Sequence, residues 1–225
     1  MHRRRRRTAL LLSAAITAAA PLLSACGSDA HPGAAAVVGG ERITVSQLEN
    51  RVNDVRAAQR AASADEAQYQ RLVAQTGTLT RHTLNGMVLE KVLDQALEDA
   101  GVRVTRKEVQ EYRSALEEQE GGSQGLELSW LQQYNVAPEH LDESIRSDVE
   151  VQRLATALGV DVNTPDGSAV FWQAMAKASE KLGVDLNPRY GTWDVEVEKQ
   201  GRVGMAEAKT PWVREVTKAG TQEPA

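Results

Sequence analysis

The stretch Gly121-Gly122-Ser123-Gln124-Gly125 has the G-x-S-x-G pattern that presents the nucleophilic serine of α/β-hydrolases. In those enzymes the serine follows a strand and opens a helix, and the sharp turn exposes its hydroxyl to a histidine base. Here we expect helices on both sides of the pattern, and His140 is the only histidine that follows it. We therefore interpret the pattern as a glycine-rich loop. A small hydrolase that uses Ser123 stays as an alternative, which the substitution Ser123→Ala would test.

Other residues that commonly carry chemistry are scattered along the chain. The four histidines lie at positions 2, 31, 82 and 140, without an H-E-x-x-H motif, a C-x-x-C motif or a phosphate-binding glycine loop. The carboxylates Glu117, Glu118 and Glu120 are typical of the solvated end of a helix. We therefore predict no catalytic residue, no metal and no cofactor, and we expect that the protein is not an enzyme.

The single cysteine, Cys26, has surroundings that predict a modification. Five consecutive arginines precede the uncharged stretch TALLLSAAITAAAPLLSA, which runs up to this cysteine and is typical of an export signal. The residues LSAC at 23–26 resemble the lipobox of bacterial lipoproteins, in which the cysteine becomes the first residue and carries acyl chains such as palmitate. We expect a signal peptide over residues 1–25 and a flexible tether over 26–35. The protein would then be extracytoplasmic and anchored to the cell membrane as a lipoprotein through Cys26.

The chain without its signal peptide is strongly acidic. The full sequence has 26 Lys and Arg against 31 Asp and Glu, and residues 1–25 contain five arginines and no acid. The remainder has 26 − 5 = 21 basic and 31 acidic residues, a formal charge of −10. This charge argues against a nucleic-acid partner and against electrostatic attraction to anionic lipids. Contact with the lipid bilayer is therefore expected only through the acylated cysteine.

Apolar periodicity predicts that the rest of the chain is mostly α-helical. A short strand or hairpin comes first, with Val37 and Val38 before a Gly-Gly turn. Two capping boxes, SQLE at 46–49 and TRKE at 105–108, predict helix starts. Further helices are expected over 126–134, from Pro138 to about residue 158, and over 168–184.

The strongest predicted helix covers residues 79–101. Its apolar face is broad enough to predict packing on more than one side, so we expect it to be the central helix; the face consists of Leu84, Met87, Val88, Val92, Leu93, Ala96 and Leu97. A glycine inside a helix costs about 1 kcal/mol relative to alanine. We interpret Gly86, which lies within this helix, as a sign of close packing there.

The order of these parts resembles a known family. A lipobox, the stretch AAVVGGERITVSQLENRV, several helices and the ending GVDLNPRYGTWD are together similar to the SurA-type N-terminal chaperone domain of exported foldases, including the PrsA lipoproteins. The resemblance covers about residues 34–194. It implies a multi-helix domain with a small β element, in which Val37 and Val38 pair with the closing segment around Tyr190 and Trp193. We place the domain at 36–194 and expect a disordered tail over 195–225.

The resemblance also implies binding without catalysis. Full-length foldases carry a parvulin-type prolyl isomerase before their terminal helix and strand, whereas the corresponding junction here, 159–167, has nine residues. We expect a holdase that binds unfolded or newly exported polypeptides and lacks isomerase activity. Large aromatic residues provide contact area at little entropic cost, and the candidate client contacts are Trp130, Tyr134, Tyr112 and Trp172. An envelope scaffold with one specific protein partner is the alternative.

Overall fold

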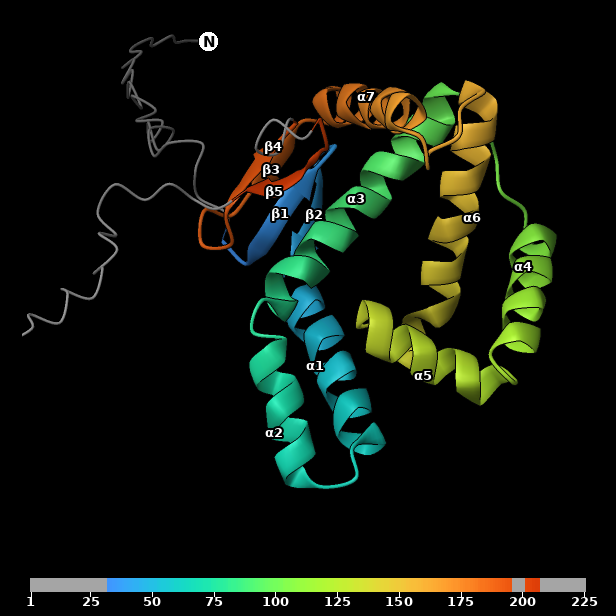
Figure 1. Cartoon of the computed structure of the whole chain (residues 1–225). Helices are drawn as coiled ribbons and strands as arrows, with labels where there is room; N and C mark the ends of the chain where they lie inside the picture. Colours follow the sequence, from blue (N-terminus) through green and yellow to red (C-terminus); the bar gives the residue numbers. More distant parts are fainter. Residues whose placement is uncertain (1–31, 196–200, 207–225) are drawn as a thin grey trace, which may run out of the picture. The chain divides into compact units, whose positions relative to one another are not determined.

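A computed structural model describes residues 32–195 and 201–206 of the chain (Figure 1). Cys26 and the predicted signal peptide lie outside these residues, as do 196–200 and 207–225. The elements in chain order are β1 (Ala34–Val38), β2 (Glu41–Thr44), α1 (Val45–Ala62), α2 (Glu66–Gln75), α3 (Leu79–Asp99), α4 (Arg106–Gln119), α5 (Ser123–Tyr134), the 3-10 helix η1 (Pro138–His140), α6 (Leu141–Leu158), α7 (Pro165–Leu182), β3 (Val184–Leu186), β4 (Thr192–Asp194) and β5 (Gly204–Ala206). The predicted mostly α-helical fold with a small β element is confirmed.

Hydrogen bonds at the helix starts explain where α1 and α4 begin. The predicted box at α4 is present, since the Glu108 backbone N–H donates to Thr105 Oγ1 (3.3 Å) and the Thr105 N–H donates to the Glu108 carboxylate (2.7 Å). Helix α1 begins before the predicted SQLE box, because Thr44 forms a box with Gln47 instead. The Gln47 N–H donates to Thr44 Oγ1 at 3.1 Å, and the Thr44 N–H donates to Gln47 Oε1 at 2.8 Å. Both registers satisfy the same sequence pattern, which therefore could not separate them.

Helix α3 is the centre of the fold, as predicted. It packs against α1, α6 and α7 and also contacts β1 and β5 (Figure 1). Its fully buried side chains are Leu79, Leu84, Val88, Val92, Leu93, Ala96 and Leu97. All of them except Leu79 form the main hydrophobic core together with Leu48 of α1, Leu154 of α6 and Phe171 of α7. Leu79 belongs to a smaller cluster that includes Val55 of α1 and Leu131 of α5. The helix predicted over 168–184 is present as α7, which buries Phe171, Met175 and Ala178.

A three-stranded antiparallel sheet joins the two ends of the domain in the order β2-β1-β3. Ala36 is paired with Leu186 and Val38 with Val184, so the predicted tie between the N-terminal strand and a C-terminal segment is present. The predicted partner, however, is wrong. Val37 and Val38 pair with β3 rather than with the segment around Tyr190 and Trp193. The domain also begins at Ala34, within the predicted tether, because Ala34 and Ala35 are buried in β1.

Trp193 belongs to a second, smaller sheet, and Tyr190 lies in the turn before it. Trp193 lies in β4 and is paired with Met205 of β5, and both residues pack against the main core. Val203, just before β5, is 3% exposed. The predicted domain end at residue 194 is therefore wrong, because the described residues 201–206 also belong to the folded domain. The sequence missed β5 because a three-residue strand is too short to show a period.

Candidate binding groove between α3 and α6

The Ser123 region is a turn between two helices. Gly121 and Gly122 adopt φ values of 76° and 112°, which side chains rarely tolerate. A Cβ on Gly125 would lie 1.8 Å from the Glu120 carbonyl oxygen, so the third glycine is required by close packing. The Ser123 hydroxyl donates to Glu127 of its own helix (3.3 Å). Since α4 rather than a strand precedes Ser123, the arrangement lacks the geometry of a nucleophile elbow.

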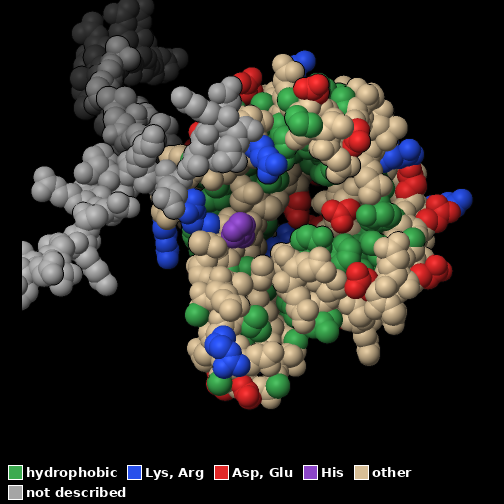
Figure 2. All heavy atoms as spheres, viewed as in Figure 1, with side chains coloured by type: hydrophobic (Ala, Val, Ile, Leu, Met, Phe, Trp, Pro, Cys, Tyr) green, Lys and Arg blue, Asp and Glu red, His purple; other side chains and the backbone are tan. Residues whose placement is uncertain are grey.

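A groove runs between α3 and α6. It consists of two adjoining cavities of about 450 and 460 Å³, which share Gly86, Glu90 and Ser144 as lining residues. One cavity extends toward α1 and the end of α5, and the other toward α7. Figure 2 shows the molecule hollowed between these helices, with charged side chains inside the hollow. Each cavity is within the size range of ligand pockets, and together they form an elongated site.

Gly86 keeps the middle of this groove open. A Cβ built on Gly86 would have no atom within 4 Å, so the interpretation of this glycine as a close-packing residue is wrong. Across the groove, α6 contributes the small side chain of Ser144. The two helices therefore leave space between them where larger side chains would meet.

The two ends of the groove differ in chemistry. The end toward α7 has an apolar wall that includes Leu93, Val151, Phe171, Trp172 and Met175. The rings of Phe171 and Trp172 are edge to face, with centroids 5.6 Å apart, which fixes the Trp172 ring at the rim. This end can accept apolar side chains.

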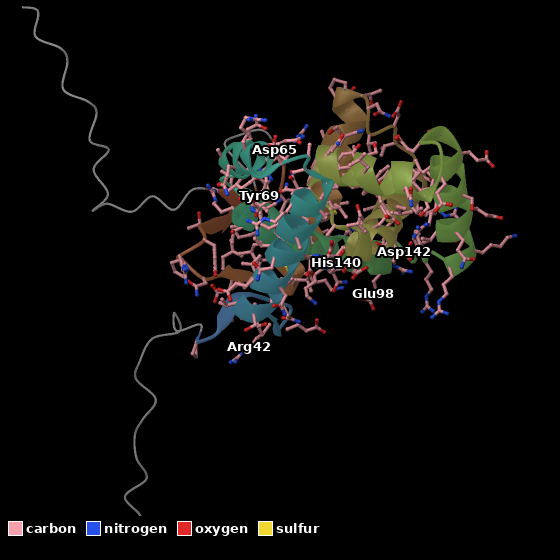
Figure 3. All side chains as sticks on the ribbon, turned by 90° about the horizontal axis from the view of Figure 1, so that it is seen from below. Arg42, Asp65, Tyr69, Glu98, His140 and Asp142 are labelled. Carbon is pink, nitrogen blue, oxygen red and sulfur yellow. The ribbon has the colours of Figure 1, made fainter. Side chains whose placement is uncertain are left out.

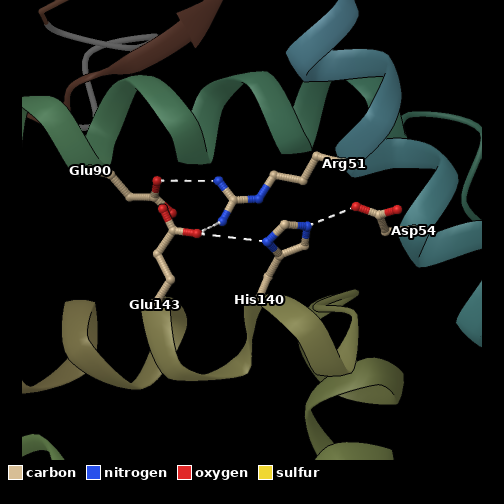
Figure 4. A network of polar contacts seen from close by, with 5 residues as sticks. All are labelled: Arg51, Asp54, Glu90, His140 and Glu143. Atoms are coloured by element: carbon tan, nitrogen blue, oxygen red, sulfur yellow. Dashed lines mark hydrogen bonds and ion pairs between the residues drawn. The ribbon is translucent and has the colours of Figure 1, made fainter.

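The opposite end carries a polar network that links three elements (Figure 4). The Arg51 guanidinium of α1 donates to Glu90 of α3 (3.4 Å) and forms a second ion pair with Glu143 of α6. His140 lies between α1 and the start of α6 (Figure 3), where its Nε2 is 2.9 Å from Asp54 of α1. One guanidinium thus serves two carboxylates, of which Glu90 lines the groove and Glu143 does not.

Burial changes the acid–base properties of the groove. Loss of water raises the pKa of Glu90 to about 7, and Arg51 only partly offsets this effect, while the nearby carboxylates of Glu143 and Asp94 add to it. Burial also raises the pKa of Asp148 on α6. A carboxyl group whose pKa is near 7 exchanges its proton in the physiological pH range.

Stability should therefore fall as the pH rises from about 4.5 to 7. In this window the folded protein retains a proton on Glu90 that the unfolded chain has lost, so the slope of the unfolding free energy with pH is negative. The substitution Glu90→Gln should flatten this dependence by about 1–3 kcal/mol. Urea unfolding at a series of pH values would measure it. Glu41→Gln is the control, because pairing with Lys91 lowers the pKa of Glu41 instead of raising it. If the unfolding free energy of the native protein and of Glu90→Gln changed equally with pH, the prediction would be contradicted.

The structure separates the four predicted client contacts. Tyr134 is 60% exposed and lines one end of the groove, and the half-buried Trp172 lines the other end. Trp130 is only 7% exposed, in a core with Leu126, Leu141 and Ile145, so its prediction as an exposed contact is wrong. Tyr112 packs against that same core and does not line the groove. Trp130 is a core residue because its side of α5 packs against Leu141 and Ile145 of α6.

The residues that sequence reasoning missed are Glu90, Ser144 and Asp148. Each was hidden among ordinary polar positions of an amphipathic helix, and they converge only when α3 crosses α6. The one available signal was Gly86, a glycine in the middle of the strongest helix. A glycine within a helix suits close packing and an open groove equally well, and here it leaves the groove open.

The family follows from a comparison with family models. The model of the SurA-like N-terminal domain matches residues 3–155. The chain belongs to this family. No curated protein and no solved structure matches the chain significantly. SurA-like N-terminal domains are extracytoplasmic chaperone-type domains, so membership indicates a folding-related role with polypeptide clients.

The SurA-like match ends within α6. Helix α7 and strands β3 to β5 therefore lie beyond the matched residues, yet they complete both the core and the sheet. Within residues 32–195 and 201–206, no helix is long and apolar enough to cross a membrane. The same part of the chain has no group of three or more His, Cys, Asp or Glu side chains that could hold a metal ion.

Proposed function

We propose that this protein is an extracytoplasmic holdase that binds unfolded or newly exported polypeptides in the groove between α3 and α6. The observation that carries the proposal is the elongated groove itself, with an apolar wall at one end and the exposed Tyr134 at the other. An extended chain can fill such a space with successive side chains. Membership of the SurA-like family supports a polypeptide ligand over a small molecule.

The proposed activity is holding without prolyl isomerisation. Helices α6 and α7 are joined by residues 159–164 alone, a connection too short to hold an isomerase domain where the related foldases carry one, which supports this part of the proposal. The connection is instead a tight loop, in which the Thr164 hydroxyl donates to the Asp161 carbonyl oxygen (2.8 Å) and accepts from the Gly167 N–H (3.1 Å).

Filling the groove at Gly86 should abolish holding without unfolding the protein. Gly86→Leu places a large side chain between the two cavities, and we expect suppression of client aggregation to fall at least about fivefold, because binding in the groove is blocked. Gly86→Ala is the matched control: it adds a methyl group that meets no atom and should stabilise α3 by about 1 kcal/mol. Light scattering of two unrelated aggregating proteins measures holding, and thermal unfolding measures stability.

The same experiment separates the holdase from the envelope scaffold. A holdase suppresses aggregation of both test proteins, whereas a scaffold with one specific partner suppresses neither. Full holding by Gly86→Leu would show that clients bind elsewhere on the molecule.

Anchoring through Cys26 is the second part of the proposal. It rests on the lipobox residues LSAC at 23–26. Cys26→Ser removes the acylated thiol, so we expect the protein to move from the membrane pellet to the soluble fraction on cell fractionation. A variant in which Ser24 is replaced by Ala keeps the cysteine and should stay in the pellet. Unchanged fractionation of Cys26→Ser would contradict lipoprotein anchoring.

A further inference from the structure

The α7 end of the groove contains a carboxylate without a cation. Asp148 of α6 is half-buried beside the apolar side chains of Val151, Phe171 and Trp172. Among residues 32–195 and 201–206, no hydrogen-bond donor and no cation is paired with it. Burial alone raises the pKa of its carboxyl group, as expected for an acid that has lost water without gaining a counter-ion.

Glu90 is the second carboxylate of the groove, and the cation that pairs with it also pairs with another carboxylate. It lines both cavities, and its partner Arg51 also pairs with Glu143. The other cation that lines the α7 end is Arg202, whose guanidinium lies 6.0 Å from the centre of the Trp172 ring. It forms no ion pair with Asp148 or Glu90. The groove thus offers two carboxylates that lack a full counter-charge, Asp148 at the α7 end and Glu90 where the two cavities adjoin.

We propose that the groove selects extended apolar segments that carry a lysine or arginine, with the cationic group held by Asp148 and Glu90 and the flanking apolar side chains on the Phe171–Trp172 wall. This inference rests on the proposed holdase function and names the class of segment that it binds. Side chains alternate along an extended chain, so a cation and its apolar neighbours can face different walls of the groove. Long basic side chains also bury their methylene stems on apolar surface while the charged head reaches an acid.

The physical reason for selectivity is desolvation. A cation that leaves water for an apolar groove loses hydration unless a carboxylate replaces it. Asp148 and Glu90 have already lost part of their own hydration in the folded protein, so pairing costs them little more. A glutamate in the same place would bring a further carboxylate next to two carboxyl groups that already resist ionisation. The groove should therefore prefer basic over neutral segments and neutral over acidic ones.

Three synthetic peptides test the preference. They share one sequence of leucine, valine and serine and differ in a single central residue, which is lysine, norleucine or glutamate; norleucine keeps the apolar stem of lysine without its charge. Fluorescence anisotropy with the full protein measures each Kd. We expect the lysine peptide to bind at least about fivefold more tightly than the norleucine peptide, the glutamate peptide to bind most weakly, and the lysine advantage to shrink in high salt.

Substitutions assign the preference to the groove. Asp148→Asn keeps the size of the side chain and should remove most of the advantage of the lysine peptide over the norleucine peptide. Asp142→Asn is the control, because Asp142 is exposed on the same helix and pairs with Arg113 of α4, outside the groove. Norleucine binding as tight as lysine, or a lysine advantage that survives Asp148→Asn, overturns the inference and leaves the holdase standing. No binding by any peptide, together with no suppression of aggregation, overturns both.

Discussion

A chain that ends at Gly183 should lose about 4 kcal/mol or more of its unfolding free energy relative to a chain that ends at Ala206. The shorter chain lacks β3, so β1 keeps β2 but becomes an edge strand on its other side, and the site of the buried Leu186 is empty. It also lacks Val203 and the ring of Trp193, which pack against the main core. Urea or thermal unfolding of the two chains measures the difference.

A chain of intermediate length makes this prediction sharper. Ending at Asp194 keeps β3 but removes β5, the pairing of Trp193 with Met205 and the buried Val203. It should lose about 2 kcal/mol, close to the value of one buried valine with its neighbouring contacts. Equal stability of the chains ending at Asp194 and Ala206 would show that residues 201–206 contribute nothing to the fold.

Trp193→Ala is the single substitution for which we expect the largest loss, about 2–4 kcal/mol. The half-buried ring packs against the core, and its indole N–H donates to the hydroxyl of Ser179 at 2.7 Å. Ser179 is 2% exposed, so alanine would leave both a cavity and a buried hydroxyl without this donor. The melting temperature measures the loss.

Trp193→Phe separates the two contributions. Phenylalanine retains most of the ring packing but cannot donate to Ser179, so we expect a loss of about 1–2 kcal/mol. If Trp193→Ala melts like the native protein while aggregation suppression falls, Trp193 is a client contact and its structural role is refuted.

Local sequence determined most of the helices, although α2 (Glu66–Gln75) was not predicted. The apolar faces of α3 and α7 and the capping box of α4 depend on residues three or four positions apart, so periodicity and cap residues were sufficient to find them. The pairing of the N-terminal strand with a C-terminal segment was predicted from the family resemblance rather than from apolar periodicity or cap residues. Local patterns were nevertheless ambiguous at the start of α1. Two overlapping capping-box patterns are present there, and the cap is formed by Thr44 and Gln47 instead of Ser46 and Glu49.

Only the tertiary structure decided which distant residues meet. The pairing of β1 with β3 depends on a register between segments about 150 residues apart in the chain, as shown by Ala36 with Leu186. The roles of Trp130 and Trp193 were not visible in the sequence, because a tryptophan in a short element suits a core as well as a surface. The groove depends on the crossing of α3 and α6, which brings Gly86, Glu90 and Asp148 to one cavity. A helix encodes its own apolar face, whereas the space left between two helices is a property of their packing.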